Sequence, residues 1–143
     1  MARTVRTKAA LLALVSAVLL ALGACGAEEP NMKEADTQAV TAEYHKITPE
    51  EAKEMMEQEG VLILDVRTAD EFSAGHIENA VLIPDFEIAT RAETELTDKN
   101  QTILIYCRSG RRSASAAKQL VDLGYTAVYD FGGIIDWPYD TVR

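Results

Sequence analysis

The sequence contains few cysteines, few histidines and few basic residues. It has 2 Cys and 2 His, too few for a disulfide-stapled small fold or, with one Cys assigned to processing below, for a four-ligand zinc site. There are 14 Lys and Arg against 23 Asp and Glu, so the formal charge is −9. Nucleic-acid binding requires a basic face, and the excess of acidic residues therefore argues against nucleic acid as a partner. The composition implies no metal and no cofactor.

The first 24 residues have the pattern of a secretory signal. Three basic residues lie within the first eight, and an apolar run follows at 9–22, interrupted only by Ser16. As a helix this run would span about 21 Å, less than a ~30 Å hydrocarbon core. It ends in Leu22-Gly23-Ala24-Cys25, which resembles a bacterial lipobox. We therefore expect a lipoprotein signal peptide over 1–24, lipidation of Cys25 and a lipid anchor on the extracytoplasmic face of the cell membrane. The alternative is an ordinary signal or uncleaved anchor with a chance Cys.

Processing at Cys25 would change the character of the remaining chain. It would leave 23 acidic and 11 basic residues, a formal charge of −12, and Cys107 as the one unmodified thiol. Cysteines outside the cytoplasm usually pair, so an unpaired Cys there is a candidate reactive group. Residues 25–42, the lipidated Cys and a polar stretch rich in small residues, are expected to be a flexible tether. Residues 43–143 are expected to form a single domain.

Apolar runs alternate with helix patterns through residues 43–143. Runs at 61–64, 81–83, 102–106 and 127–129 have strand length, and a first strand is expected to begin near Ile47. Continuous rather than alternating apolar strands favour a parallel sheet covered on both faces. Helices are predicted over 48–59, with Thr48 as N-cap and Pro49 at N1, and over 113–123. The sequence thus predicts an α/β domain with about five parallel strands flanked by helices on both faces.

The segment with the clearest chemistry is Cys107-Arg108-Ser109-Gly110-Arg111-Arg112-Ser113, between a predicted strand and a predicted helix. Functional residues in parallel sheets gather at the carboxyl ends of strands. A Cys at a helix N-terminus faces unpaired N–H groups, and three nearby arginines add positive charge. Both effects favour the thiolate, which is the nucleophile, and the same loop would attract an anion. The alternative is a buried structural Cys beside a solvated basic turn.

The spacing in this loop argues against a phosphatase. Cysteine phosphatases and arsenate reductases use Cys-x5-Arg, in which the Arg binds the oxyanion. The corresponding position here is Ser113, and Arg111 and Arg112 come too early. The loop is one residue short for phosphate and suits the smaller sulfur atom.

Three motifs, in order, resemble those of rhodanese-like domains. The first signature is matched by Asp65-Val66-Arg67-Thr68-Ala69-Asp70-Glu71-Phe72 and Gly75-His76-Ile77-Glu78-Asn79-Ala80. The Cys107 loop is similar to the active-site loop, and Gly132-Gly133-Ile134-Ile135-Asp136-Trp137 to the closing signature. The resemblance runs from about Tyr44 to Trp137. It implies an enzyme of the thiosulfate sulfurtransferase type, in which sulfane sulfur passes through a persulfide on Cys107.

The resemblance also implies roles for the motif residues. The sulfur cradle and substrate site would be Arg108, Ser109, Gly110, Arg111 and Arg112. We expect Arg108 and Arg111 to contact the anionic end of thiosulfate or a related donor, while Arg112 contacts it too or points to solvent. The acceptor would be cyanide or a thiol, including a protein thiol. Asp65 and Arg67 are expected to form a structural ion pair near the loop, His76 to lie in a structural turn, and Asp70, Glu71 and Glu78 to form a solvated face.

Two alternatives to this enzyme remain open. One is a non-enzymatic, membrane-tethered rhodanese module that binds a partner or relays persulfide. The other is a Cys–His hydrolase that uses Cys107 with His76 as base. An intact Cys107 in a full basic loop favours the sulfurtransferase, because a module without activity could lose that Cys without harm. Many family members carry a helix after the closing Trp, whereas six residues follow Trp137 here.

Overall fold

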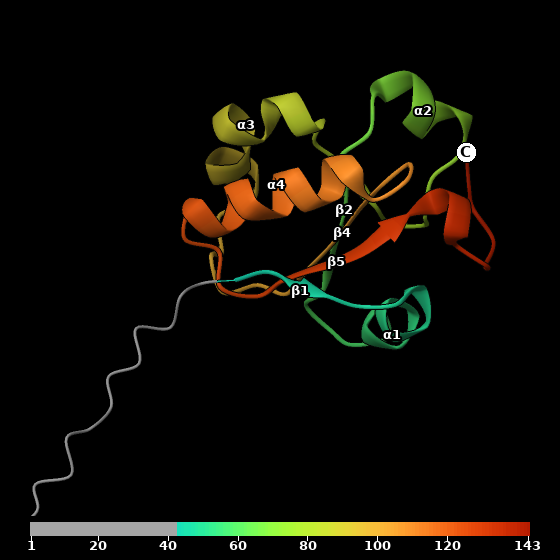
Figure 1. Cartoon of the computed structure of the whole chain (residues 1–143), viewed down its shortest axis with the longest axis horizontal. Coiled ribbons are helices and arrows are strands. Elements are labelled where there is room, and N and C mark those ends of the chain that lie inside the picture. The colour runs from blue at the N-terminus through green and yellow to red at the C-terminus, as the bar shows by residue number, and fades with distance from the viewer. Residues whose placement is uncertain (1–42) are drawn as a thin grey trace, which may run out of the picture. The chain divides into compact units, whose positions relative to one another are not determined.

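The computed structural model describes residues 43–143; the predicted signal peptide, Cys25 and the tether lie outside the described residues. The strands are β1 (His45–Lys46), β2 (Leu62–Asp65), β3 (Val81–Leu82), β4 (Ile103–Cys107) and β5 (Val128–Gly133). They form one sheet in the order β1-β5-β4-β2-β3, and every neighbouring pair is parallel (Figure 1). The predicted α/β fold with five parallel strands is confirmed.

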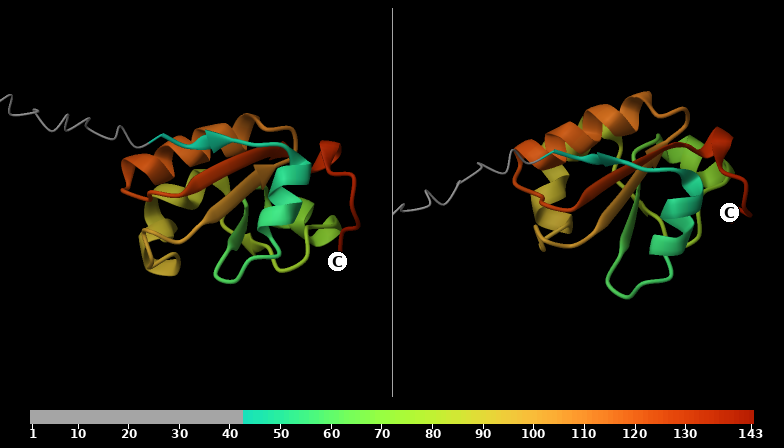
Figure 2. Two further views of the ribbon diagram at one scale, coloured as in Figure 1. Left: turned by 90° about the horizontal axis from the view of Figure 1, so that it is seen from below. Right: turned by 60° about the horizontal axis from the view of Figure 1, so that its bottom comes forward.

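Helices cover both faces of this sheet. They are α1 (Pro49–Met55), α2 (Ala69–Ala74), α3 (Ile88–Glu95) and α4 (Arg111–Asp122), with two 3₁₀ turns, η1 (Asp85–Glu87) and η2 (Ile134–Asp136). Figures 1 and 2 show α3 and α4 on one side of the sheet and α1 on the other. Within residues 43–143, no helix is long and apolar enough to cross a membrane.

The central strand β4 divides the core into two clusters. Ile103, Ile105 and Cys107 pack with the α3 and α4 side, whereas Leu104 and Tyr106 pack with the α1 side. Successive side chains of a strand point to opposite faces, so a strand covered on both sides must be apolar at every position. This explains the continuous apolar run that the sequence shows at 102–106.

Several element boundaries differ from the sequence expectation. Helix α1 begins as predicted, with a capping box between Thr48 and Glu51, but it ends at Met55 rather than at residue 59. Helix α4 begins two residues earlier than predicted, at Arg111. Strand β1 precedes Ile47 and contains His45, and β5 continues to Gly133, which carries the closing motif into the sheet.

The C-terminal residues lie along the turn that follows α2. The N–H of His76 donates to the Val142 carbonyl at 2.9 Å, and the N–H of Val142 donates to the His76 carbonyl at 2.8 Å. Arg143 Nε donates to the Ala74 carbonyl at 3.1 Å. Strand β5 lies inside the sheet between β1 and β4, so its edges are covered by strands without a further helix.

Candidate active site

Cys107 is the last residue of β4, and the chain turns directly from it into α4. The turn is closed by Gly110, the N-cap of α4, whose φ of 92° lies in the left-handed region that glycine adopts without strain. Cys107 is only 1% exposed. The sulfur therefore lies at the base of the loop, at the carboxyl edge of the sheet, as the sequence predicts.

Polar groups of the loop surround this buried sulfur. The N–H of Gly110 donates to Sγ at 3.1 Å. Burial opposes ionisation of Cys107, but the amides of Ser113, Ser109 and Gly110 and the Ser113 hydroxyl outweigh it and hold the pKa of the thiol below its ordinary value. Backbone dipoles and a hydroxyl thus favour the thiolate, which is the nucleophilic form. Sequence analysis gave no role to the Ser113 hydroxyl.

The closing motif supports the loop from the neighbouring strand. The Ser113 hydroxyl lies within hydrogen-bond distance of the carbonyls of Gly110, at 3.1 Å, and Gly132, at 3.3 Å. The N–H of Ile135 donates to the Arg108 carbonyl at 3.3 Å. The turn at Gly132 is held by the buried carboxylate of Asp130, which accepts the Gly132 N–H at 3.0 Å. The closing motif, whose Gly132-Gly133 the sequence predicts to form a turn bordering the pocket, therefore also supports the backbone of the Cys107 loop.

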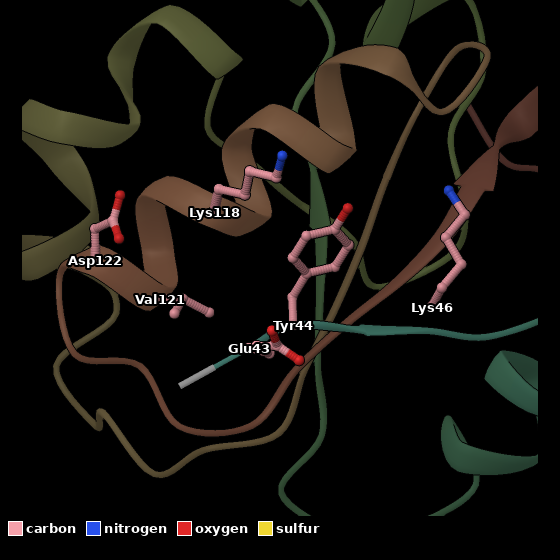
Figure 3. A pocket seen from close by; sticks show the side chains of 6 residues that line it. All are labelled: Glu43, Tyr44, Lys46, Lys118, Val121 and Asp122. Atoms are coloured by element: carbon pink, nitrogen blue, oxygen red, sulfur yellow. The ribbon is translucent and has the colours of Figure 1, made fainter. Parts of the chain in front are cut away.

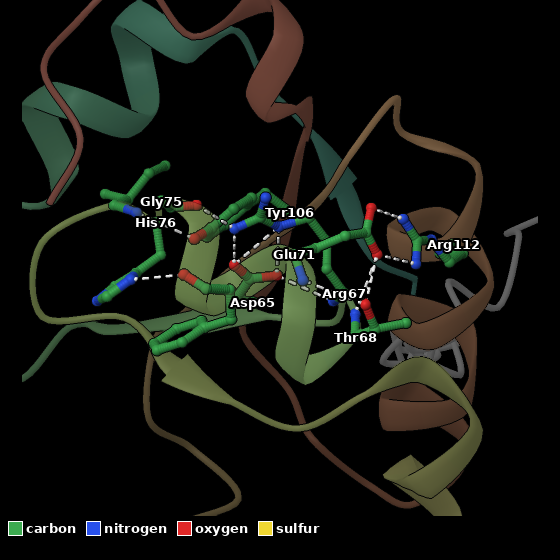
Figure 4. Close-up of polar contacts among 10 residues, drawn as sticks. Asp65, Arg67, Thr68, Glu71, Gly75, His76, Tyr106 and Arg112 are labelled. Atoms are coloured by element: carbon green, nitrogen blue, oxygen red, sulfur yellow. Dashed lines mark hydrogen bonds and ion pairs between the residues drawn. The ribbon is translucent and has the colours of Figure 1, made fainter. Parts of the chain in front are cut away.

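The three arginines of the loop have different surroundings. Arg112 donates two hydrogen bonds to the Glu71 carboxylate, at 2.7 and 2.8 Å (Figure 4). Arg108 and Arg111 are exposed, and neither has an ion-pair partner within residues 43–143. The pKa of Arg112 is raised, first by Glu71 and also by the charge of Cys107. Arg112 is therefore directed toward Glu71 of α2 and lies within electrostatic reach of the sulfur, which differs from the alternative in which it points to solvent.

Glu71 links α2 to this loop. Its carboxylate accepts the N–H of Thr68 at 3.1 Å, which completes the N-terminal capping box of α2, while it also binds Arg112. The Arg112 guanidinium, followed by the Thr68 N–H, lowers the pKa of Glu71 to about 2. The prediction that Glu71 belongs to a solvated face is wrong, because the side chain joins two helices.

Asp65 and Arg67 form the predicted ion pair at the end of β2. Arg67 Nη2 and Nε lie 2.6 and 2.9 Å from Asp65 Oδ2, and both residues are buried (Figure 4). Arg67 also donates to the Gly75 carbonyl at 2.8 Å and stacks against the ring of Tyr106. Burial, and then the neighbouring Asp65, raise the pKa of Tyr106, so its hydroxyl stays neutral and accepts the Ile77 N–H at 3.1 Å. These bonds fix the segment between β2 and β3 against β4.

His76 is occupied by local structure. Its ring stacks on Phe72 with centroids 3.7 Å apart, and its Nδ1 lies 3.0 Å from the Phe72 carbonyl. Its backbone pairs with Val142. These contacts place His76 in a structural turn, as expected, and give it no link to Cys107.

Two pockets differ in their relation to the loop. One, of about 300 Å³, lies beside it and is lined by Asp85, Arg111, Arg112 and Ser115. The other, of about 450 Å³, lies between β1 and the C-terminal part of α4 and is lined by Glu43, Tyr44, Lys46, Lys118, Val121 and Asp122 (Figure 3). The second pocket contains no residue of the Cys107 loop, so the first is the candidate substrate pocket. Within residues 43–143, no group of three or more His, Cys, Asp or Glu is placed to bind a metal.

Comparisons with known proteins agree with this geometry. Residues 48–138 match the family model described as rhodanese-like domain. The chain is 38% identical over 73 residues to thiosulfate sulfurtransferase PspE of Escherichia coli, covering 51% of this chain and 70% of that protein. It is 36% identical over 92 residues to thiosulfate sulfurtransferase GlpE of Pseudomonas putida, covering 64% of this chain and 82% of that protein.

Solved structures show the same fold. An Escherichia coli rhodanese with anions aligns with a TM-score of 0.55 at 35% identity, covering 58% of this chain and 98% of that one. The protein SSP1007 of Staphylococcus saprophyticus aligns with a TM-score of 0.61 at 32% identity, covering 69% and 99%. The likeness therefore extends over nearly the whole of each of these structures.

Proposed function

Because this chain belongs to the rhodanese-like family, we propose that it is a sulfurtransferase that moves sulfane sulfur from thiosulfate, or a related anionic donor, to a thiol or to cyanide. The observation that carries the proposal is the buried Cys107 sulfur facing the Gly110 amide at 3.1 Å, with a lowered pKa. The names of the thiosulfate sulfurtransferases to which the chain is similar support the same reaction.

The first half-reaction loads the enzyme. The Cys107 thiolate attacks the outer sulfur of thiosulfate, a new S–S bond forms, and sulfite leaves with the electron pair of the bond that breaks. Cys107 then carries a persulfide whose outer sulfur is anionic. Atoms and charge balance without an added oxidant, because sulfite is the leaving group.

The second half-reaction discharges the enzyme. A thiolate or cyanide ion attacks the outer sulfur of the persulfide, and the bond to Cys107 Sγ breaks with its electron pair returning to Cys107. The products are an acceptor persulfide or thiocyanate and the original thiolate. Donor and acceptor thus occupy the site in turn, which is the ping-pong pattern of covalent catalysis.

The loop supplies what both steps require. Fixed N–H dipoles stabilise the thiolate and the persulfide anion without reorganising during the reaction. Arg108 and Arg111 are exposed at the loop, and within residues 43–143 neither is engaged by a carboxylate. We assign to them the binding of the anionic end of the donor. Arg112, held by Glu71, contributes its charge from a fixed position.

The sequence pattern at residues 1–25 supports a location for this activity. We propose that the protein is a lipoprotein anchored through Cys25 on the extracytoplasmic face of the cell membrane. Cells that express the protein should incorporate labelled fatty acid into it, and Cys25→Ser should remove the label. Labelling that persists in that variant, or is absent from the wild type, would contradict the anchor.

The reaction is tested with thiosulfate and cyanide. The purified protein should produce thiocyanate and should gain the mass of one sulfur atom when treated with thiosulfate alone. Cys107→Ser should lose both properties, whereas His76→Ala, if folded, should keep Cys107-dependent transfer. Folded wild-type protein that neither turns over nor gains sulfur with several donors would favour the non-enzymatic module instead.

A further inference from the structure

The pocket of about 300 Å³ beside the active-site loop is lined by charges of both signs. Its lining residues are Asp85, Arg111, Arg112 and Ser115. A run of three arginines in the sequence suggests a purely cationic site, but the fold adds a carboxylate from a distant segment. This combination bears on which sulfur compound the site accepts.

The elements that carry these groups are fixed in place. Asp85 is the first residue of η1, and its N–H donates to the Val66 carbonyl at 3.0 Å. Arg111 and Arg112 begin α4, and Ser115 follows one turn later. The charges are therefore presented by η1 and α4, which pack against each other.

One of the two arginines is already balanced. Arg112 is bound by both oxygens of Glu71. Within residues 43–143, Arg111 and the Asp85 carboxylate have no ion-pair or side-chain hydrogen-bond partner, and they do not pair with each other. One cation and one anion thus face the same cavity across a gap. An anion without a positive group could satisfy only Arg111, whereas a molecule with both charges could satisfy both residues.

The pocket adjoins the loop that holds the reacting sulfur. Arg111 and Arg112, which line the pocket, are the first residues of α4. They follow Gly110, whose N–H donates to Cys107 Sγ at 3.1 Å. The charge of the Cys107 thiolate is also among the causes that raise the pKa of Arg112. The volume of the pocket equals that of about ten water molecules, which is enough for a small thiol. A ligand in this pocket would therefore lie next to the loop that holds the Cys107 sulfur.

We propose that this pocket is the acceptor subsite and that it selects small thiols carrying both an ammonium and a carboxylate, that is, amino-acid thiols. The inference rests on the proposed function and names its acceptor class. Asp85 binds the ammonium and Arg111 the carboxylate. The acceptor thiolate attacks the outer persulfide sulfur, the bond to Cys107 Sγ breaks, and the acceptor leaves as a persulfide. Donor and acceptor bind in turn, so Arg111 serves both.

The test measures discharge of preformed persulfide. The purified protein is loaded with thiosulfate, freed of excess donor and mixed with one of three thiols. Cysteine carries both the ammonium and the carboxylate, cysteamine carries the ammonium alone, and 3-mercaptopropionate carries the carboxylate alone. Thiols differ in intrinsic nucleophilicity, so the quantity compared is the ratio of wild-type to variant rate constants for each thiol. The variants are Asp85→Asn, Arg111→Gln and Asp122→Asn. Asp122 is an exposed carboxylate at the far end of α4 and serves as the matched control.

The expected pattern separates the two charges. Asp85→Asn should slow discharge by cysteine and cysteamine roughly fivefold and should not slow 3-mercaptopropionate. Arg111→Gln should slow discharge by cysteine and by 3-mercaptopropionate but not discharge by cysteamine. Asp122→Asn should leave the rate of discharge by all three thiols unchanged. The inference would be overturned if Asp85→Asn and Arg111→Gln each slowed discharge by all three thiols equally, or if neither variant slowed any discharge. The proposed sulfur transfer would not be contradicted by either result. If thiosulfate loads no persulfide onto the wild type, the proposed function itself fails.

Discussion

Gly133 lies directly against the carbonyl of Arg108. A Cβ at position 133 would stand 2.4 Å from the Arg108 oxygen and 2.6 Å from the Ser109 Cα. Both neighbours are backbone atoms of the active-site loop, so neither can turn aside as a flexible side chain would. The last residue of β5 therefore sets how closely the loop approaches the sheet, and with it the positions of the amides that face Cys107.

This contact predicts that Gly133→Ala displaces the loop. Overpacking of this kind costs about 1–3 kcal/mol of stability. Because the displaced atoms carry the amide cradle, we expect sulfur transfer to fall by more than the stability loss explains, which steady-state rates measured on folded protein would show. Gly60→Ala is the comparison: Gly60 has a φ of 80° but nothing within 4 Å of its Cβ position. It should lower stability and leave transfer unchanged; equal activity in the two variants would contradict the role of Gly133.

The amide cradle predicts the pH dependence of Cys107 reactivity. The folded thiol has a pKa lowered from its ordinary value of 9.0, so its reaction with iodoacetamide should titrate with a midpoint below that value. Ser113→Ala removes a hydroxyl that stabilises the thiolate, so the midpoint should move to higher pH. Ser115→Ala, on the exposed side of the same helix, should not move it. A midpoint that is the same in all three proteins would contradict the assigned role of Ser113.

The sequence was sufficient for the layout of this site. Continuous apolar runs indicated a parallel sheet covered on both faces, and the position of Cys107 between strand and helix placed it at the carboxyl edge. These features are local: strand burial and the strand-to-helix turn depend on neighbouring residues. Both are present in the structure.

The sequence was not sufficient for the distribution of charge around the sulfur. Glu71 and Arg112 are 41 positions apart, and their pairing depends on how α2 packs beside α4. Asp85 enters the pocket from η1, and Gly133 approaches the loop from β5. Such relationships arise from tertiary packing. Residue types and spacing alone suggested a uniformly cationic loop, whereas the fold pairs Arg112 with Glu71 and places Asp85 in the pocket that Arg111 lines.

The buried ion pair of Asp65 and Arg67 predicts a large effect of removing one partner. Asp65→Asn would leave Arg67, a residue that is 5% exposed, without a counter-charge. Breaking a buried pair in this way costs about 3–5 kcal/mol because a buried charge is left uncompensated, and replacing both charged groups with uncharged ones of similar size avoids that cost. Urea denaturation should therefore rank Asp65→Asn as less stable than the double variant Asp65→Asn, Arg67→Met. The opposite order would mean that the pair does not govern this region.

The Glu71–Arg112 pair predicts an acid-sensitive contribution to stability. Arg112 lowers the pKa of Glu71 from 4.5 to about 2, so the pair stabilises the fold fully above pH 4.5 and loses this effect as the pH falls toward 2. Glu71→Gln should cost about 1 kcal/mol at neutral pH, because the pair is partly exposed. The matched control is Glu51→Gln, since Glu51 completes the same capping box at Thr48.

The difference between these two variants isolates the pair from helix capping. In urea denaturation, Glu71→Gln should be the less stable variant at pH 7, and the gap should narrow as the pH is lowered through 4.5, because protonation removes the Glu71 charge that the variant lacks. Release of Arg112 from α2 should also change the rate of persulfide loading in Glu71→Gln and not in Glu51→Gln. A stability gap that stays constant with pH would show that the guanidinium does not interact with the ionised carboxylate, and Glu71 would then be a helix cap alone.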